Sequence, residues 1–123
     1  MAKLKSFREL TVWQKAFTLV VKTYRHTSDF PSTERFGLVS QMRRSAISVV
    51  SNIAEGSARS TRKDYAHFIS NSLGSCSELE TQVLLSEALK FLSPEKSREL
   101  LAGLKEIAKI LTVLRKRLLE PVT

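Results

Sequence analysis

The sequence has little of what β-sheet, disulfide-linked and membrane-spanning proteins need. Its 123 residues include one cysteine, three prolines and four glycines. A single cysteine excludes an internal disulfide and is compatible with a reducing compartment, so we expect a cytoplasmic protein. The scarcity of glycine and proline argues against many strands and tight turns. No apolar run approaches the ~20 residues of a membrane span, and no signal peptide is visible, so we expect no membrane association.

Residue patterns typical of catalysis or metal binding are also absent. The two histidines, His26 and His67, fall on different predicted helices, and there is no His-Glu-x-x-His or Glu-x-x-His motif. A glycine-rich phosphate loop is missing too. Cys76 lies on an apolar stripe, which indicates a core thiol rather than a nucleophile. We therefore predict a protein that is not an enzyme and holds no metal or cofactor.

What the chain does have is helical periodicity. Apolar residues recur every three or four positions over residues 11–28, 33–56, 61–92 and 94–119, and we predict a helix in each range. Short connections between long helices favour antiparallel neighbours. The prediction is one domain over residues 1–123, an all-α, up-down-up-down four-helix bundle with left-handed packing.

Four start signals and one stop signal set these boundaries. The start signals are hydroxyl residues at N-cap positions: Thr11 with Gln14, Ser32, Thr61 with Asp64, and Ser93 before Pro94. Gly56 is predicted to end the second helix, because glycine readily adopts the left-handed conformation.

The first two helices each show an apolar face. On the first helix it consists of Trp13, Ala16, Phe17, Val20 and Tyr24. We interpret Trp13 and Phe17 as core residues rather than as surfaces for stacking. On the second helix the face consists of Val39, Met42, Ala46, Val49, Val50 and Ile53.

A polar stripe runs along the other side of the second helix. It consists of Gln41, Arg44, Ser48, Asn52 and Glu55, and the third helix carries a matching row that includes Ser75 and Glu78. Arg44 and Glu78 are placed to pair across the two helices. Three interpretations remain open: a solvated face, a polar network between helices or subunits, and a ligand or catalytic site that uses Glu55 and Arg44.

The formal net charge of +8 favours an anionic partner. In the predicted topology the chain start, the turn between the second and third helices, and the chain end meet at one end of the bundle. Nine cations gather there: Lys3, Lys5, Arg8, Arg59, Arg62, Lys63, Arg115, Lys116 and Arg117. The acids predicted at that end are Glu9, Glu55, Asp64 and Glu120. Arg59, Arg62 and Lys63, beside the first amides of the third helix, form a candidate anion site. The alternative is a solvated end that is basic for solubility.

Several motifs carry a family resemblance. They are the segment from Phe7 to Ala16, Phe30-Pro31, the run from Gly37 to Arg44, Asn52-Ile53-Ala54-Glu55-Gly56, and the run from Gly74 to Glu80. Over about residues 7–92 the chain resembles the 23S rRNA intervening-sequence family of bacterial four-helix-bundle proteins, whose activity is essentially unassigned. A related bundle is the accessory protein of diversity-generating retroelements, a basic homopentamer that works with nucleic acid. The resemblance implies a homo-oligomer, with a pentamer as the specific expectation, and favours nucleic-acid binding.

These observations lead to two functional hypotheses. The first is an oligomeric scaffold that binds the RNA or DNA backbone through the nine cations, with little sequence specificity. The alternative is a protein-interaction adaptor with no direct nucleic-acid role, in which the basic surface matches an acidic partner protein.

Overall fold

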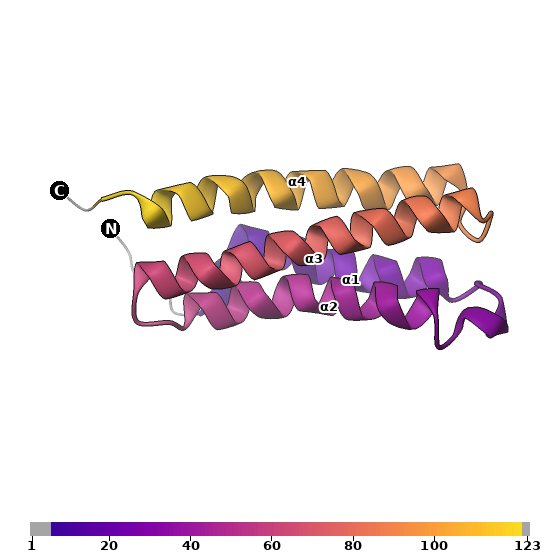
Figure 1. The fold of residues 1–123 in the computed structure, drawn as a ribbon, viewed down its shortest axis with the longest axis horizontal. Helices are drawn as coiled ribbons and strands as arrows, with labels where there is room; N and C mark the ends of the chain where they lie inside the picture. The colour runs from indigo at the N-terminus through magenta and orange to yellow at the C-terminus, as the bar shows by residue number, and fades with distance from the viewer. Residues whose placement is uncertain (1–5, 122–123) are drawn as a thin grey trace.

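The computed structural model describes residues 6–121 and contains four long helices (Figure 1). They are α1 (Thr11–Thr27), α2 (Leu38–Ser57), α3 (Arg62–Ala88) and α4 (Pro94–Leu119), joined by connections that include the short 3-10 turn η2 (Ser32–Glu34). A second 3-10 turn, η1 (Phe7–Glu9), precedes α1. No strand occurs within residues 6–121. The predicted all-α class with four helices is confirmed.

The helices form a square in which each helix packs against two others. α2 contacts α1 and α3, and α4 contacts α3 and α1. α2 and α3 are antiparallel: the Ser48 and Ser75 hydroxyl oxygens lie 2.7 Å apart, and the Ser86 hydroxyl lies 3.3 Å from the Met42 sulfur. One end of the bundle therefore holds the α2–α3 turn, and the other holds the α1–α2 and α3–α4 connections (Figure 1). The left-handed packing stays a prediction.

The core follows the predicted stripe of α2. Met42, Ala46, Val49 and Ile53 are fully buried, and Val39 is nearly so. The facing helices α3 and α4 contribute their own fully buried side chains: Ile69, Leu79, Val83, Leu100 and Leu111. Removing this apolar surface from water is the main stabilising contribution to the bundle.

α1 is rotated relative to its predicted apolar face. Its buried residues are Val12, Ala16, Leu19, Thr23 and Thr27. Phe17 and Tyr24 are instead 52% and 40% exposed, and Trp13 is half-buried, so assigning Phe17 to the core was wrong. The two threonines tolerate burial because each hydroxyl bonds a carbonyl one turn earlier, Thr23 to Leu19 and Thr27 to Thr23, both at 2.7 Å.

The second helix starts at Leu38 rather than at residue 33, and Ser32 does not cap it. Ser32 opens only η2. The Glu34 carboxylate accepts a hydrogen bond from the Leu38 amide at 3.4 Å, which serves one of the unpaired donors at the start of α2. A Cβ on Gly37 would lie 3.1 Å from that carboxylate oxygen, so glycine leaves room for this contact.

The third helix ends at Ala88, before the predicted residue 92, in a Schellman motif. The Phe91 amide bonds the Ser86 carbonyl and the Lys90 amide bonds the Glu87 carbonyl, both at 2.9 Å. Lys90 has a φ of 65°, the left-handed conformation that glycine usually supplies in this motif.

We expect Lys90→Gly to raise the free energy of unfolding by about 1 kcal/mol. A left-handed conformation costs a residue with a Cβ about 1–2 kcal/mol, and glycine's greater freedom in the unfolded chain offsets part of the gain. Urea denaturation measures the change. Lys90→Ala removes the same charge but keeps the Cβ, so equal stability of the two variants would contradict the explanation.

Of the four predicted N-caps, those at Thr61 and Ser93 are present, and those at Thr11 and Ser32 are absent. The Thr61 hydroxyl accepts from the Asp64 amide at 3.1 Å, and the Ser93 hydroxyl accepts from the Lys96 amide at 3.2 Å. α1 has no side-chain cap, so the predicted capping box at its start was wrong. Gln14 instead donates to the Arg8 carbonyl at 2.8 Å.

Gly56 lies within α2 and does not end it through a left-handed conformation, because no glycine among the described residues has a positive φ. A Cβ at this position would lie 2.9 Å from the Phe68 Cβ and 2.9 Å from the Tyr65 Cδ1. The glycine is needed because α2 and α3 approach closely beside their turn. Its predicted role was wrong.

Candidate functional site

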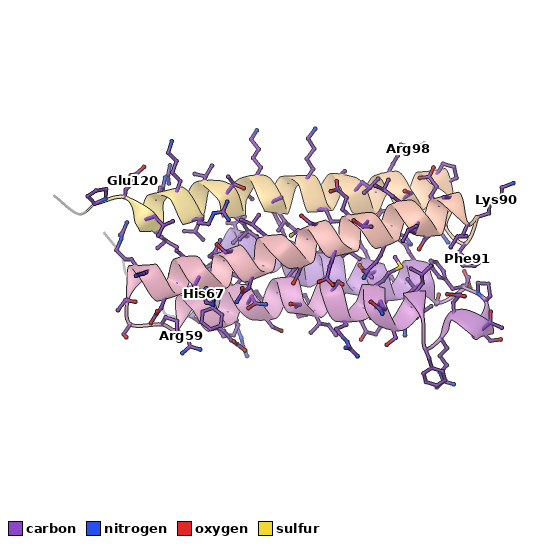
Figure 2. The ribbon with its side chains drawn as sticks, in the orientation of Figure 1. Arg59, His67, Lys90, Phe91, Arg98 and Glu120 are labelled. Atoms are coloured by element: carbon purple, nitrogen blue, oxygen red, sulfur yellow. The ribbon has the colours of Figure 1, made fainter. Side chains whose placement is uncertain are left out.

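Arg62 links the start of α3 to the end of α4. Its Nε donates to the Leu118 carbonyl at 3.3 Å, and a terminal guanidinium nitrogen donates to the Arg117 carbonyl. The α2–α3 turn, the end of α4 and the described chain start therefore lie at one end of the bundle, which we call the basic pole (Figure 1). Figure 2 shows Arg59 and Glu120 at this pole and Lys90 and Arg98 at the other. The predicted convergence of these segments is confirmed, while Lys3 and Lys5 lie outside the described residues.

Three cations of the basic pole are engaged within the protein. Besides Arg62, the Arg59 guanidinium lies 4.4 Å from the centroid of the Phe68 ring, and Arg115 donates to the Ser70 hydroxyl at 3.3 Å. Arg62 also complements the negative end of the α4 dipole. The sequence did not reveal these contacts, because they join side chains that are far apart along the chain or depend on rotamers.

Four other cations of the basic pole point into solvent. Arg8, Lys63, Lys116 and Arg117 are exposed, and within residues 6–121 no carboxylate lies within ion-pair distance of them. The candidate anion site at the start of α3 is reduced to Lys63, since Arg62 turns toward α4 and Thr61 occupies the Asp64 amide. The available positive charge is spread over three segments rather than held in one pocket.

Part of the polar stripe forms a network between α2 and α3 of one chain. The Ser48 hydroxyl contacts Ser75, and the Asn52 side-chain amide donates to the Ser48 carbonyl at 2.8 Å and lies 3.1 Å from the Ser48 hydroxyl oxygen. These side chains are half-buried or buried, so their hydrogen bonds satisfy polar groups that the helix contact removes from water.

The remaining residues of the stripe, and Glu78 in the matching row of α3, do not join this network. Gln41, Arg44, Glu55 and Glu78 are exposed, and the expected ion pair between Arg44 and Glu78 is absent from the described structure. Arg44 and Glu55 are eleven positions apart on α2, or about 16 Å along the axis. Within residues 6–121 no ion pair joins these two side chains, so the structure does not bring them together in a shared site.

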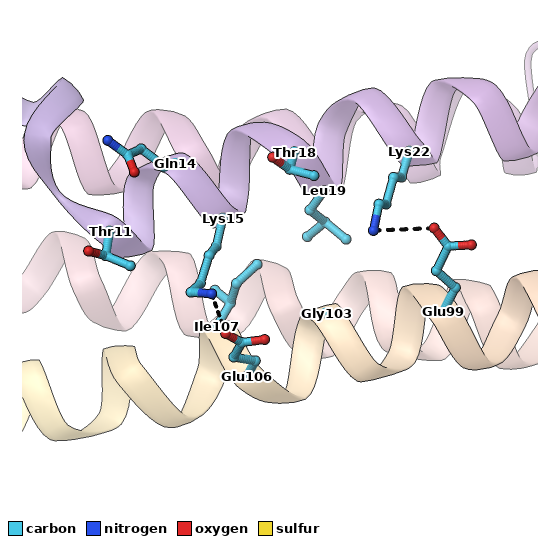
Figure 3. Close-up of a pocket in the computed structure, with 10 residues that line it drawn as sticks. All are labelled: Thr11, Gln14, Lys15, Thr18, Leu19, Lys22, Glu99, Gly103, Glu106 and Ile107. Carbon is cyan, nitrogen blue, oxygen red and sulfur yellow. Dashed lines mark ion pairs between the residues drawn. The ribbon is translucent and has the colours of Figure 1, made fainter.

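A groove of about 350 Å³ between α1 and α4 is bordered by ion pairs (Figure 3). Lys15 pairs with Glu106, and Lys22 lies 3.2 Å from Glu99, which also accepts from His26 at 3.3 Å. The hydrogen bond from Lys22, followed by that from His26, lowers the pKa of Glu99. The charges in this groove are mutually satisfied, and we interpret them as holding α1 against α4 rather than as a ligand site.

Cys76 is buried on the core face of α3, as the sequence predicted. Burial, with a smaller contribution from Glu80, raises the pKa of its thiol to about 12. A thiol with a raised pKa is a poor nucleophile at neutral pH, because the thiolate is the reactive form.

We expect the Cys76 thiol to resist a disulfide reagent at pH 8 in the folded protein and to react rapidly in urea. The folded state binds this proton more tightly than the unfolded state, so the free energy of unfolding falls as the pH rises from about 9 toward 12. Absorbance of the released thiol measures the first effect, and alkaline urea titrations measure the second. Rapid labelling of the folded protein would show that the core around Cys76 opens readily.

Within residues 6–121 the side chains form no typical metal site and the helices no typical membrane span. No cluster of three metal-ligating side chains is present there. In the same residues, no helix is long and apolar enough to cross a membrane.

The fold and the site define a class: a small, basic, all-α protein built on four helices. Residues 8–113 match the family described as 23S rRNA-intervening sequence protein, and the chain belongs to this family. A solved structure from Bacteroides thetaiotaomicron, a protein of unknown function from the S23 ribosomal protein family, aligns with a TM-score of 0.78 and 22% identity. The alignment covers 86% of this chain and 99% of that one, and it shows a shared fold. No curated protein matches the chain.

Proposed function

We propose that this protein is a non-enzymatic, oligomeric scaffold that binds the RNA or DNA backbone through its basic pole. The observation that carries the proposal is the convergence of three chain segments, which leaves Arg8, Lys63, Lys116 and Arg117 exposed without a described acidic partner. Phosphate contacts from such cations position nucleic acid without reading its sequence. The homo-oligomer, a pentamer by family resemblance, repeats the pole and strengthens weak individual contacts.

Binding of labelled RNA and DNA oligonucleotides at 50 mM and 200 mM salt tests the proposal. Four phosphate contacts predict that the affinity falls by about a hundredfold over this range, through counterion release. Undetectable binding at the lower salt by a folded oligomer would exclude the nucleic-acid role.

An adaptor function is the second candidate. A largely apolar groove near the basic pole, lined by residues that include Leu10, Ile110 and Val113, favours it. Copurification with and without nuclease separates the two functions, because a protein partner retained after nuclease treatment supports the adaptor.

A further inference from the structure

A basic and aromatic groove lies between α1 and α2, at the pole opposite the basic pole. This arginine groove has a volume of about 470 Å³. It is lined by residues that include Tyr24, Arg35, Phe36, Arg43, Arg44 and Ile47. Its described lining contains three arginines and no carboxylate, and the two acids of the α1–α2 connection, Asp29 and Glu34, do not line it. The groove therefore favours an anionic occupant.

Two aromatic rings of the arginine groove are exposed to solvent. Phe36 is 89% exposed, which is unusual for a large apolar side chain, and Tyr24 is 40% exposed. The guanidinium carbon of Arg35 lies 5.5 Å from the centroid of the Phe36 ring, and that of Arg43 lies 4.4 Å from the centroid of the Tyr24 ring. Arg43 also donates to the Thr27 hydroxyl at 3.1 Å, so it holds the Tyr24 ring in place. Each ring offers a surface for stacking beside a cation.

A row of further rings continues from the arginine groove along the same flank of α1. Phe17 lies seven positions, or about two helical turns, before Tyr24, so both side chains project from one side of the helix. Phe17 is 52% exposed, and its ring centroid lies 5.3 Å from that of Trp13, which in turn lies 5.2 Å from that of Phe7. Phe7 directly precedes Arg8 of the basic pole, so the row runs from the arginine groove to the basic pole.

We propose that single-stranded RNA or DNA occupies the arginine groove. The bases stack on Phe36 and Tyr24. The phosphates contact Arg35 and Arg44, which are exposed and make no ion pair within residues 6–121. Stacking needs an accessible base face, which a duplex hides between neighbouring base pairs, so the groove selects single strands. The inference rests on the proposed nucleic-acid binding and adds the substrate class and a second contact surface.

Fluorescence anisotropy tests this inference with oligothymidylate, oligouridylate and a DNA duplex, each about 12 nucleotides long. We expect the unmodified protein to bind both single strands at least fivefold more tightly than the duplex at 50 mM salt. Phe36→Leu keeps an apolar side chain but removes the ring, so single-strand binding should weaken about tenfold while duplex binding and the salt dependence stay unchanged. Phe36→Trp keeps a ring and should bind as the unmodified protein does.

Two further variants test the charges and provide a control. Arg35→Ala combined with Arg44→Ala should lower the slope of log affinity against log salt by about 1.4, because each phosphate contact with a single strand contributes roughly 0.7. Leu89→Ala removes a 54% exposed apolar side chain at the same pole but outside the arginine groove, and it should leave binding unchanged. Circular dichroism checks the folding of each variant, and light scattering checks its oligomeric mass.

The outcomes separate this inference from the proposed function. Unchanged single-strand affinity of Phe36→Leu, with weaker binding once the cations of the basic pole are replaced, overturns the stacking site and leaves the proposed function intact. Equal weakening of single-strand and duplex binding also overturns it, because the ring then does not act through accessible bases. An unmodified protein that binds no oligonucleotide overturns both. A lower oligomeric mass of Phe36→Leu, with unchanged affinity, assigns the groove to a second copy of the chain instead.

Discussion

Gly56→Ala is expected to lower the free energy of unfolding by about 1–3 kcal/mol, the usual cost of overpacking. A methyl group at this position would lie 2.9 Å from atoms of both Tyr65 and Phe68, so α3 has to shift at Phe68 and the Tyr65 ring has to move with it or change rotamer. Neither adjustment is easy, because the contact lies beside the short α2–α3 turn and one of the close atoms is the Phe68 Cβ, which moves only with its backbone. Urea denaturation with an unchanged m value measures the loss.

Gly74 provides a matched control within the neighbouring helix. It is exposed in the middle of α3, and a Cβ there would meet no atom within 4 Å. Gly74→Ala should therefore raise the free energy of unfolding by about 1 kcal/mol through helix propensity alone. Stabilisation of both variants would show that α2 and α3 separate easily at Gly56, contrary to the packing argument.

Replacing Lys63, Lys116 and Arg117 with alanine is expected to weaken oligonucleotide binding about a hundredfold at 50 mM salt. These side chains are exposed and lack ion-pair partners within the described residues, so their loss should not destabilise the fold. Each lost phosphate contact lowers the slope of log affinity against log salt by roughly 0.9, giving a total near three. Fluorescence anisotropy over a salt series measures both quantities.

A second triple variant separates position from net charge. Replacing Arg25, Lys96 and Arg98 with alanine removes the same charge from the bundle, and Arg98 lies at the opposite pole (Figure 2). We expect this variant to bind within about threefold of the unmodified protein, because charges beyond the Debye length, about 14 Å at 50 mM salt, are largely screened. Equal weakening by both triple variants would show that overall charge, rather than the basic pole, determines binding.

The fold was predictable where side-chain chemistry and helical period agreed. On α2 only one stripe is apolar, so the buried face was identified from Val39 to Ile53. On α1 the aromatic residues Trp13, Phe17 and Tyr24 were assigned to the apolar face. The structure buries Thr23 and Thr27 instead, because hydroxyls bonded within the helix are satisfied without water. Hydrophobic periodicity alone does not contain that information.

Helix ends and the details of the site depended on individual contacts. Lys90 ends α3 in the left-handed conformation, which is rare for lysine. The Glu34 carboxylate accepts from the first amide of α2, although the sequence predicted Ser32 as the cap. The meeting of three segments at one pole followed from topology, which connection lengths indicate well. Topology did not predict which of these cations are free to contact a ligand. Arg59 lies over the Phe68 ring and Arg62 donates to backbone carbonyl groups, and neither contact is visible in the sequence.

Because Arg62 anchors the end of α4, we expect bound anions to alter that end. One guanidinium donates to two carbonyl oxygens of the last helical turn. A phosphate that draws it away leaves the Leu118 carbonyl to water, while the Arg117 carbonyl still accepts from the Glu120 amide at 3.3 Å. A bound phosphate and the last carbonyl groups of α4 therefore compete for the Arg62 guanidinium. Amide exchange in the final turn of α4 would then quicken when nucleic acid engages Arg62, and would stay slow when the neighbouring lysines suffice.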